Sequence, residues 1–153
     1  MGCLSGRGPA HRQRGSRRPS IRPRRVSGVQ PVSVPRIDPW QVWLVDFGNP
    51  VGHEEGGVRP AVVVGSATHC RFPIGMAIVV PLTTRNRGLL HHVEIRSAES
   101  GLARPSWART EDITAVSVER FPRPQPLGKV STAEIECLSE WLREMVAFAA
   151  QRP

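Results

Sequence analysis

The stretches Gly56–Gly65 (GGVRPAVVVG) and Val79–Arg85 (VVPLTTR) decide the predicted fold. Each stretch overlaps a nearly all-apolar run: Pro60–Gly65 lies within the first stretch, and Ala77–Leu82 overlaps the second. Both runs are rich in valine and too short for typical helices, so each predicts a buried β-strand.

Polar side chains flank these two strands. A glycine loop precedes Arg59, and Thr83 and Thr84 end the second run. A guanidinium is planar, permanently charged and shaped for phosphate oxygens, and a hydroxyl can donate one more hydrogen bond. The pattern predicts a phosphate-handling pair. Two structural roles stay open: Arg59 pairing with Glu54 or Glu55, and Thr83 capping a turn.

Further short segments complete a mainly β domain. Strands are predicted at Gln41–Phe47, His92–Arg96 and Trp107–Ile113, with a turn or short helix at Val116–Phe121. Trp107 is expected in the core. About five strands followed by one C-terminal helix indicate a small, strongly bent barrel.

The C-terminal helix has a clear start and an apolar face. Ser131 and Glu134 have the spacing of a capping box. Apolar residues repeat on one face, at positions 135, 138, 142, 145 and 149. This face is expected to pack on the sheet. Cys137, Trp141 and Phe148 widen the apolar surface, which indicates either more core or a dimer contact.

The net charge of +8 belongs to the N-terminal segment and not to the domain. Residues 1–36 hold nine of the 21 basic side chains and no acidic ones, which leaves twelve basic against thirteen acidic in residues 37–153. We expect a disordered Arg/Pro-rich tail at 1–36. It is interpreted as a nucleic-acid-binding arm, a neutral tail or an extension from a misplaced start codon.

Composition and residue spacing also argue against a metal or cofactor site, a membrane span and a signal peptide. Cys3, Cys70 and Cys137 lack CxxC spacing, which favours a reducing compartment and a cytoplasmic location. No matched ligand spacing predicts a metal, and no cofactor is predicted. No apolar run reaches the length of a membrane span, and the N-terminus lacks the apolar region of a signal peptide.

Four blocks of the chain resemble the MazF/PemK family of toxin endoribonucleases. The segment GHEEGGVRP within the first block is the most specific part. The blocks are Val42–Val64 (VWLVDFGNPVGHEEGGVRPAVVV), Val79–Thr84 (VVPLTT), His92–Ile95 (HVEI) and Thr110–Ile113 (TEDI). With the final helix, the resemblance spans about residues 40–150.

This resemblance implies a CcdB-like, SH3-like barrel that acts as a homodimer. It implies metal-independent cleavage of single-stranded RNA, usually mRNA, at a short sequence by attack of the RNA's own 2′-hydroxyl. A cognate antitoxin would suppress this activity. The family's catalytic arginine falls on Arg59 and its catalytic Ser/Thr on Thr83.

The chain departs from the family pattern at two places. Trp40-Gln41 stands where Gly-Asp is common before the first strand, and this change is expected to affect strand packing alone. Asp112 stands where many members have glutamine. A carboxylate there would repel phosphate, so the position either reads a base edge or makes no contact with RNA.

Other residues complete the predicted site. Glu55 and His53 are candidates for proton transfer or for orienting Arg59, because a guanidinium hardly deprotonates. A polar loop after Thr83 suits a single-stranded backbone, and a histidine ring can stack on a base. The RNA-binding candidates are Thr84, Arg85, Asn86, Arg87 and His91. An ordinary solvated loop is the alternative.

Two other functions remain open for this fold. One is a non-enzymatic, CcdB-like poison of a topoisomerase, which would need neither Arg59 nor Thr83. The other is an inactive paralogue that binds antitoxin, which the departure at Asp112 keeps open.

Overall fold

The structure is a computed structural model that describes residues 34–148. The expectation of a disordered tail at 1–36 falls almost wholly outside this range. Neither helix of the described part is long and apolar enough to cross a membrane.

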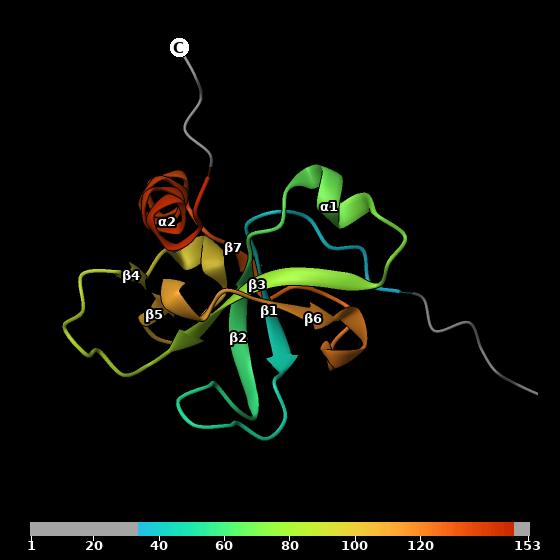
Figure 1. Ribbon diagram of the computed structural model, residues 1–153, viewed down its shortest axis with the longest axis horizontal. Coiled ribbons are helices and arrows are strands. Elements are labelled where there is room, and N and C mark those ends of the chain that lie inside the picture. The colour runs from blue at the N-terminus through green and yellow to red at the C-terminus, as the bar shows by residue number, and fades with distance from the viewer. Residues whose placement is uncertain (1–33, 149–153) are drawn as a thin grey trace, which may run out of the picture. The chain divides into compact units, whose positions relative to one another are not determined.

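Seven strands and two helices make up the described domain, together with three short 3-10 turns (Figure 1). The strands are β1 (Gln41–Asp46), β2 (Val58–Val63), β3 (Met76–Thr83), β4 (His92–Ile95), β5 (Ser106–Arg109), β6 (Thr114–Ser117) and β7 (Gly128–Lys129). The helices are α1 (Ala67–Arg71) and α2 (Thr132–Met145), and the 3-10 turns are η1 (Ala98–Ser100), η2 (Thr110–Asp112) and η3 (Val118–Arg120). The predicted class, mainly β with a C-terminal helix, is confirmed.

Strand β3 is the centre of an antiparallel sheet with the order β4-β5-β3-β2-β1-β7. It pairs with β2 and β6 along its first part and with β5 at Leu82 and Thr83. Because one strand serves both groups of partners, the sheet curls about β3. Figure 1 shows α2 on the side of β4 and β5.

Alternate residues of the central strands enter two separate cores. Trp43, Val45, Ala61, Val63, Ala77 and Val79 point to one face, and Val42, Val62, Val80 and Leu82 to the other. The second face is covered by Leu138 of α2. Both faces of the sheet are therefore buried, which explains why the strands have almost continuous apolar sequences.

Some predicted boundaries were wrong. The strand expected at Trp107–Ile113 ends at Arg109 and gives way to η2. The Thr110 hydroxyl is buried here and donates to the carbonyl of His91, 2.8 Å away. Val116–Phe121 divides between the end of β6 and η3. Trp107 is half-buried and lies outside both core clusters.

Helix α1 and strand β7 were not predicted, and both are short. Helix α1 has five residues and starts at Ser66, whose side chain accepts a hydrogen bond from the amide of His69. Strand β7 has two residues and is defined by its pairing with β1. Neither is long enough to show a periodic apolar pattern.

Trp40 adopts a left-handed backbone conformation with φ +69°, which side chains larger than glycine rarely take. The resemblance described above leads us to expect glycine at this position. The carbonyl of Trp40 accepts from Val130, and its side chain packs against the second core. The substitution thus alters backbone strain as well as strand packing.

Helix α2 begins with the predicted capping box between Ser131 and Glu134. The Glu134 carboxylate also joins the helix to the segment after β4. It accepts hydrogen bonds from the amides of Arg96 and Ser97, both 2.9 Å away, and from the Ser97 hydroxyl at 2.7 Å. Burial opposes ionisation, but these donors and Ser131 together lower the pKa of Glu134 to about 2.

We expect Glu134→Gln to remove part of the acid sensitivity of the fold. The pKa of Glu134 is depressed from 4.5 to about 2, so its ionised form stabilises the native state above pH 5. This contribution, about 3 kcal/mol, is lost as pH falls from about 5 to 2. Urea unfolding at pH 7 and pH 3 should show a smaller loss of stability on acidification in Glu134→Gln than in wild type. Equal losses would contradict the assignment.

Candidate active site

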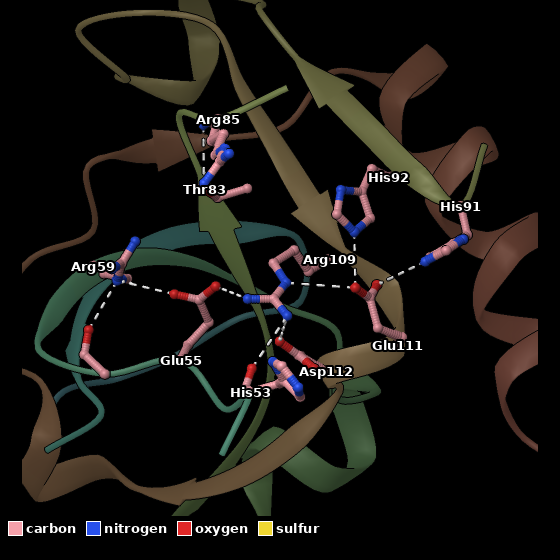
Figure 2. Close-up of polar contacts among 11 residues, drawn as sticks. His53, Glu55, Arg59, Thr83, Arg85, His91, His92, Arg109, Glu111 and Asp112 are labelled. Atoms are coloured by element: carbon pink, nitrogen blue, oxygen red, sulfur yellow. Dashed lines mark hydrogen bonds and ion pairs between the residues drawn. The ribbon is translucent and has the colours of Figure 1, made fainter. Parts of the chain in front are cut away.

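Arg59 lies near the start of β2, opposite Val45 of β1, with its side chain 44% exposed. Its Nε donates to the carbonyl of Gly56 at 2.8 Å and lies 3.0 Å from Oε2 of Glu55 (Figure 2). Among residues 34–148, no hydrogen bond engages its two terminal nitrogens. Arg59 is therefore held by Nε while its outer edge stays free.

Glu55 is the residue that holds Arg59, and its side chain is only 7% exposed. One carboxylate oxygen faces Arg59, and the other forms an ion pair and hydrogen bond with Nη1 of Arg109. This pairing realises the open structural role of Arg59, with Glu55 as the partner. Glu54 instead accepts a hydrogen bond from the amide of Val51.

Arg109, at the end of β5, is a buried charge surrounded by acceptors. Besides Glu55, its Nη2 lies 2.8 Å from Asp112 and its Nε lies 3.5 Å from Glu111. The carbonyl of His53 accepts a hydrogen bond from Nη2 at 3.4 Å. The contact with Asp112 is an ion pair without hydrogen-bond geometry. A guanidinium with five donors suits such a crowded position.

The ion pair with Arg109 explains how the protein accommodates a partly buried carboxylate at position 112. Burial raises the pKa of Asp112, Arg109 opposes this rise, and Glu111 adds to it. The negative charge is partly matched within the protein, so its repulsion of a nearby phosphate is weaker than the sequence suggested. The carboxylate at position 112 is thus paired with a buried arginine.

Thr83 ends β3 and is buried. Its Oγ1 accepts a hydrogen bond from the amide of Arg85 at 3.2 Å, which realises the predicted turn-capping role. Within the described range, the hydroxyl proton has no acceptor. A hydroxyl can accept and donate at once. Thr83 can therefore keep its turn and still donate to a ligand.

Arg59 and Thr83 lie at the corresponding ends of two neighbouring strands. The pairing of β2 with β3 runs from Val63–Val79 to Ala61–Pro81. Arg59 lies two residues beyond this pairing in β2, which begins at Val58, and Thr83 lies two residues beyond it at the end of β3. No hydrogen bond joins their side chains in the described domain. The structure thus places the predicted pair at one end of the sheet without direct contact.

A hollow of about 320 Å³ opens beside Arg59. We call it the basic hollow, because its lining has three arginines (59, 87 and 109) and His53 against two glutamates, Glu54 and Glu55. A second hollow, of about 360 Å³, is lined by Glu54, Glu55, Asp112 and several apolar residues. Glu54 and Glu55 line both hollows.

The predicted RNA-binding loop is exposed. Thr84, Arg85, Asn86 and Arg87 are all exposed, and the Asn86 side chain accepts from the amide of Gly88 at 2.8 Å. Arg87 is the member of this loop that reaches the basic hollow.

His91 lies at the far end of the same loop, in a cluster with His92 and Glu111. Nε2 of His92 lies 2.8 Å from one oxygen of Glu111, and Nε2 of His91 lies 3.3 Å from the other (Figure 2). Burial acts to raise the pKa of Glu111, but the hydrogen bond from His92 and the other nearby groups leave it lowered.

Comparison with known proteins identifies the family. Residues 38–146 match the family described as PemK-like, MazF-like toxin of type II toxin-antitoxin system. The chain belongs to this family. It is 34% identical over 108 residues to Endoribonuclease MazF9 of Mycobacterium tuberculosis, which covers 67% of this chain and 90% of the relative. The predictions of a toxin family and of an endoribonuclease are confirmed at this level.

Solved structures confirm the barrel fold predicted for this MazF-like toxin. MazF from Deinococcus radiodurans superimposes with a TM-score of 0.62 at 18% identity, covering 71% of this chain and 94% of that chain. An endoribonuclease in complex with its cognate antitoxin, from a mycobacterial species, gives a TM-score of 0.59 at 19% identity, covering 71% and 93%.

Sequence reasoning missed Arg109 and Glu111 of this MazF-like toxin. Nothing in the sequence distinguishes Arg109 from exposed arginines. Its burial follows from pairing with Glu55, which is 54 residues away in sequence. The one sequence signal that could have identified these two residues is the TEDI block, which contains Glu111 and directly follows Arg109.

Proposed function

We propose that this MazF-like toxin is a sequence-specific endoribonuclease that cleaves single-stranded RNA, in particular mRNA, by attack of the 2′-hydroxyl on the adjacent phosphate, without a metal ion. One observation carries the proposal. Arg59 is fixed through Nε by Glu55 and Gly56, and its terminal nitrogens point to no described partner. That is the arrangement needed to receive a phosphate.

Arg59 stabilises the charge that builds on the phosphorane. Two terminal N–H groups of a guanidinium can contact two phosphate oxygens at once. Donors fixed before the reaction need no reorganisation when the charge develops. The buried Glu55 supplies this fixation, and Arg109 supports Glu55 from behind.

Thr83 donates its hydroxyl proton to the same phosphate or to the developing charge. The hydrogen bond from the amide of Arg85 orients the hydroxyl oxygen from the protein side. Because Thr83 is buried at a strand end, its position is more precise than that of the exposed Thr84.

Glu55 is an orienting residue and a poor general base in this arrangement. Both of its oxygens face arginines, which favour the ionised form and occupy its lone pairs. His53 is exposed beside the basic hollow, and its ring makes no hydrogen bond to a described residue. An imidazole nitrogen can accept or donate a proton, so we assign the proton-transfer role to His53.

The exposed loop after Thr83 binds the RNA strand near the cut. Arg85 and Arg87 attract the backbone, while Thr84 and Asn86 offer hydrogen bonds to bases or sugar. His91 stacks on a base. Base recognition rests on such loop groups because the chain has no tyrosine and few other aromatic residues.

The proposed partners are a cognate antitoxin and a second copy of the toxin, both in the cytoplasm with the mRNA. A structural relative is recorded with its cognate antitoxin. For the homodimer, exposed apolar side chains offer contact surface, including Phe72, Ile74 and Phe148. Cys137 is also exposed, whereas Trp141 packs against the second core.

The full-length protein, incubated with a long RNA in EDTA, should cut at a short recurrent sequence and leave 5′-hydroxyl ends. Wild-type protein that leaves every RNA intact would overturn the proposal. If it instead traps a topoisomerase on DNA, the non-enzymatic alternative is supported. Binding to the antitoxin without either effect would support the inactive paralogue.

A further inference from the structure

We propose that His91, His92 and Glu111 form a binding site for a divalent transition metal ion of the Zn²⁺ type. The three side chains each offer one ligand atom, and these atoms all lie within 4.8 Å of one another. The site is separate from the hollow beside Arg59, whose lining includes none of the three. The ion takes no part in the proposed cleavage chemistry, although one of its ligands, His91, is also proposed to stack on an RNA base.

The donor set determines which ions fit. Two imidazole nitrogens and one carboxylate suit Zn²⁺ and similar ions, whereas Mg²⁺ and Ca²⁺ prefer oxygen ligands alone. Three protein ligands leave a fourth position for water. Glu111 and His91 have side chains 31% and 28% exposed, so an ion can enter from solvent.

The distances are close to those a metal would require. Tetrahedral zinc, with bonds of about 2.0–2.2 Å, separates its ligand atoms by about 3.3 Å. Nε2 of His91 lies 3.3 Å from Oε2 of Glu111, and Nε2 of His92 lies 2.8 Å from Oε1. The three ligand atoms lie within 4.8 Å of one another, so the side chains must shift to bring all three to about 3.3 Å. The two rings are nearly perpendicular, at 84°, with centroids 4.9 Å apart.

Contacts from three segments of the chain hold the ligands in place. The carbonyl of His91 accepts a hydrogen bond from Thr110, whose neighbour is Glu111. The amide of His92 donates to the carbonyl of Leu89 at 3.1 Å. From α2, the ring of Trp141 meets His91 edge-on, with centroids 6.3 Å apart. His91 and Glu111 are the partly exposed members, so their side chains have room to adjust around an ion.

The surrounding charge accommodates a cation. Arg109 is the nearest positive group, with Nε 3.5 Å from Glu111. Its charge is already matched by Glu55 and by Asp112. Arg59 in turn faces Glu55. Arg87 also acts on Asp112, so the three arginines and three carboxylates balance when the histidines are neutral, and no net positive charge opposes an ion.

Metal binding would fix the C-terminal end of the exposed loop. His91 follows this loop directly, and Glu111 belongs to η2 on the other side of the cluster. Zn²⁺ would add a link between them beyond the existing backbone contacts. We therefore expect slower amide hydrogen exchange in residues 85–91 when Zn²⁺ is present.

Calorimetric titration of the metal-free full chain with zinc chloride tests the site. Wild type should bind one more Zn²⁺ per chain than His91→Ala, or bind it at least about tenfold more tightly, since loss of even an outer partner of a metal ligand costs that much. Glu111→Gln keeps a neutral hydrogen-bond acceptor for His92 and should lose the site as well. Circular dichroism confirms that both variants are folded.

Two matched controls should retain full binding. Cys137→Ser removes an exposed thiol of α2 that offers an unrelated zinc ligand. Arg59→Ala impairs the proposed cleavage but keeps all three ligands, so its zinc affinity should equal that of wild type. This result would hold even if the proposed cleavage were wrong. The proposal is overturned if wild type binds no Zn²⁺, or if His91→Ala and Glu111→Gln bind it as wild type does.

Discussion

Arg59→Ala should reduce RNA cleavage by about 10²–10³-fold while leaving the fold intact. Loss of one fixed donor to a developing oxyanion typically costs this much. The side chain is 44% exposed and makes no core contact, so thermal unfolding should change little. The measurement is the single-turnover rate on a short RNA that contains the mapped cut site.

Arg59→Lys separates charge from shape. Lysine keeps the positive charge but cannot reproduce either the hold through Nε or a two-point phosphate contact. We expect an intermediate rate, closer to that of Arg59→Ala. Arg104→Ala, a change at an exposed arginine remote from the hollow lining, serves as the charge-matched control and should cleave as wild type does. Cleavage by Arg59→Ala at the wild-type rate would remove Arg59 from the catalytic machinery.

Arg109→Met should have the largest effect on stability, a loss of about 3–5 kcal/mol in the free energy of unfolding. The Arg109 side chain is 8% exposed, and the Glu55 carboxylate it pairs with is 7% exposed. Removing one partner leaves the other as a buried charge without full compensation. Urea unfolding at pH 7 measures the loss, and the cleavage rate should fall because Glu55 no longer orients Arg59.

A double variant tests whether this loss comes from the unpaired carboxylate. Glu55→Gln in the Arg109→Met background removes the buried charge, so stability should recover substantially. Activity should stay low, because Arg59 has lost its ionic partner. If Arg109→Met unfolds at the wild-type urea concentration, the buried network is not a source of stability.

The sequence predicted the strands that carry their own local signals. The sequence predicted the buried strands around Ala61 and Val79 because each contains a local run of apolar residues. It predicted the capping box at Ser131 because that motif has a fixed residue spacing. The left-handed backbone conformation of Trp40 and the two-residue strand β7 could not be predicted from the sequence. Both depend on contacts with distant segments, as Trp40 shows in its hydrogen bonds to Val63 and Val130.

The candidate site divides in the same way. Arg59 and Glu55 lie four residues apart in one loop, so their pairing could be proposed as an alternative from sequence. The link from Glu55 to Arg109 spans 54 residues and the link from His92 to Glu111 spans 19. Such contacts arise when β4 and β5 are brought beside the β1–β2 loop, which no local pattern encodes.

The most direct test of the central claim is a single 2′-deoxy substitution in the RNA, at the nucleotide 5′ to the mapped cut. Attack by the 2′-hydroxyl requires that oxygen, so the deoxy substrate should bind with similar affinity and remain uncut by the wild-type protein in EDTA. The unmodified RNA should yield a 2′,3′-cyclic phosphate end and a 5′-hydroxyl end. Cleavage of the deoxy substrate at the same phosphate would contradict the account.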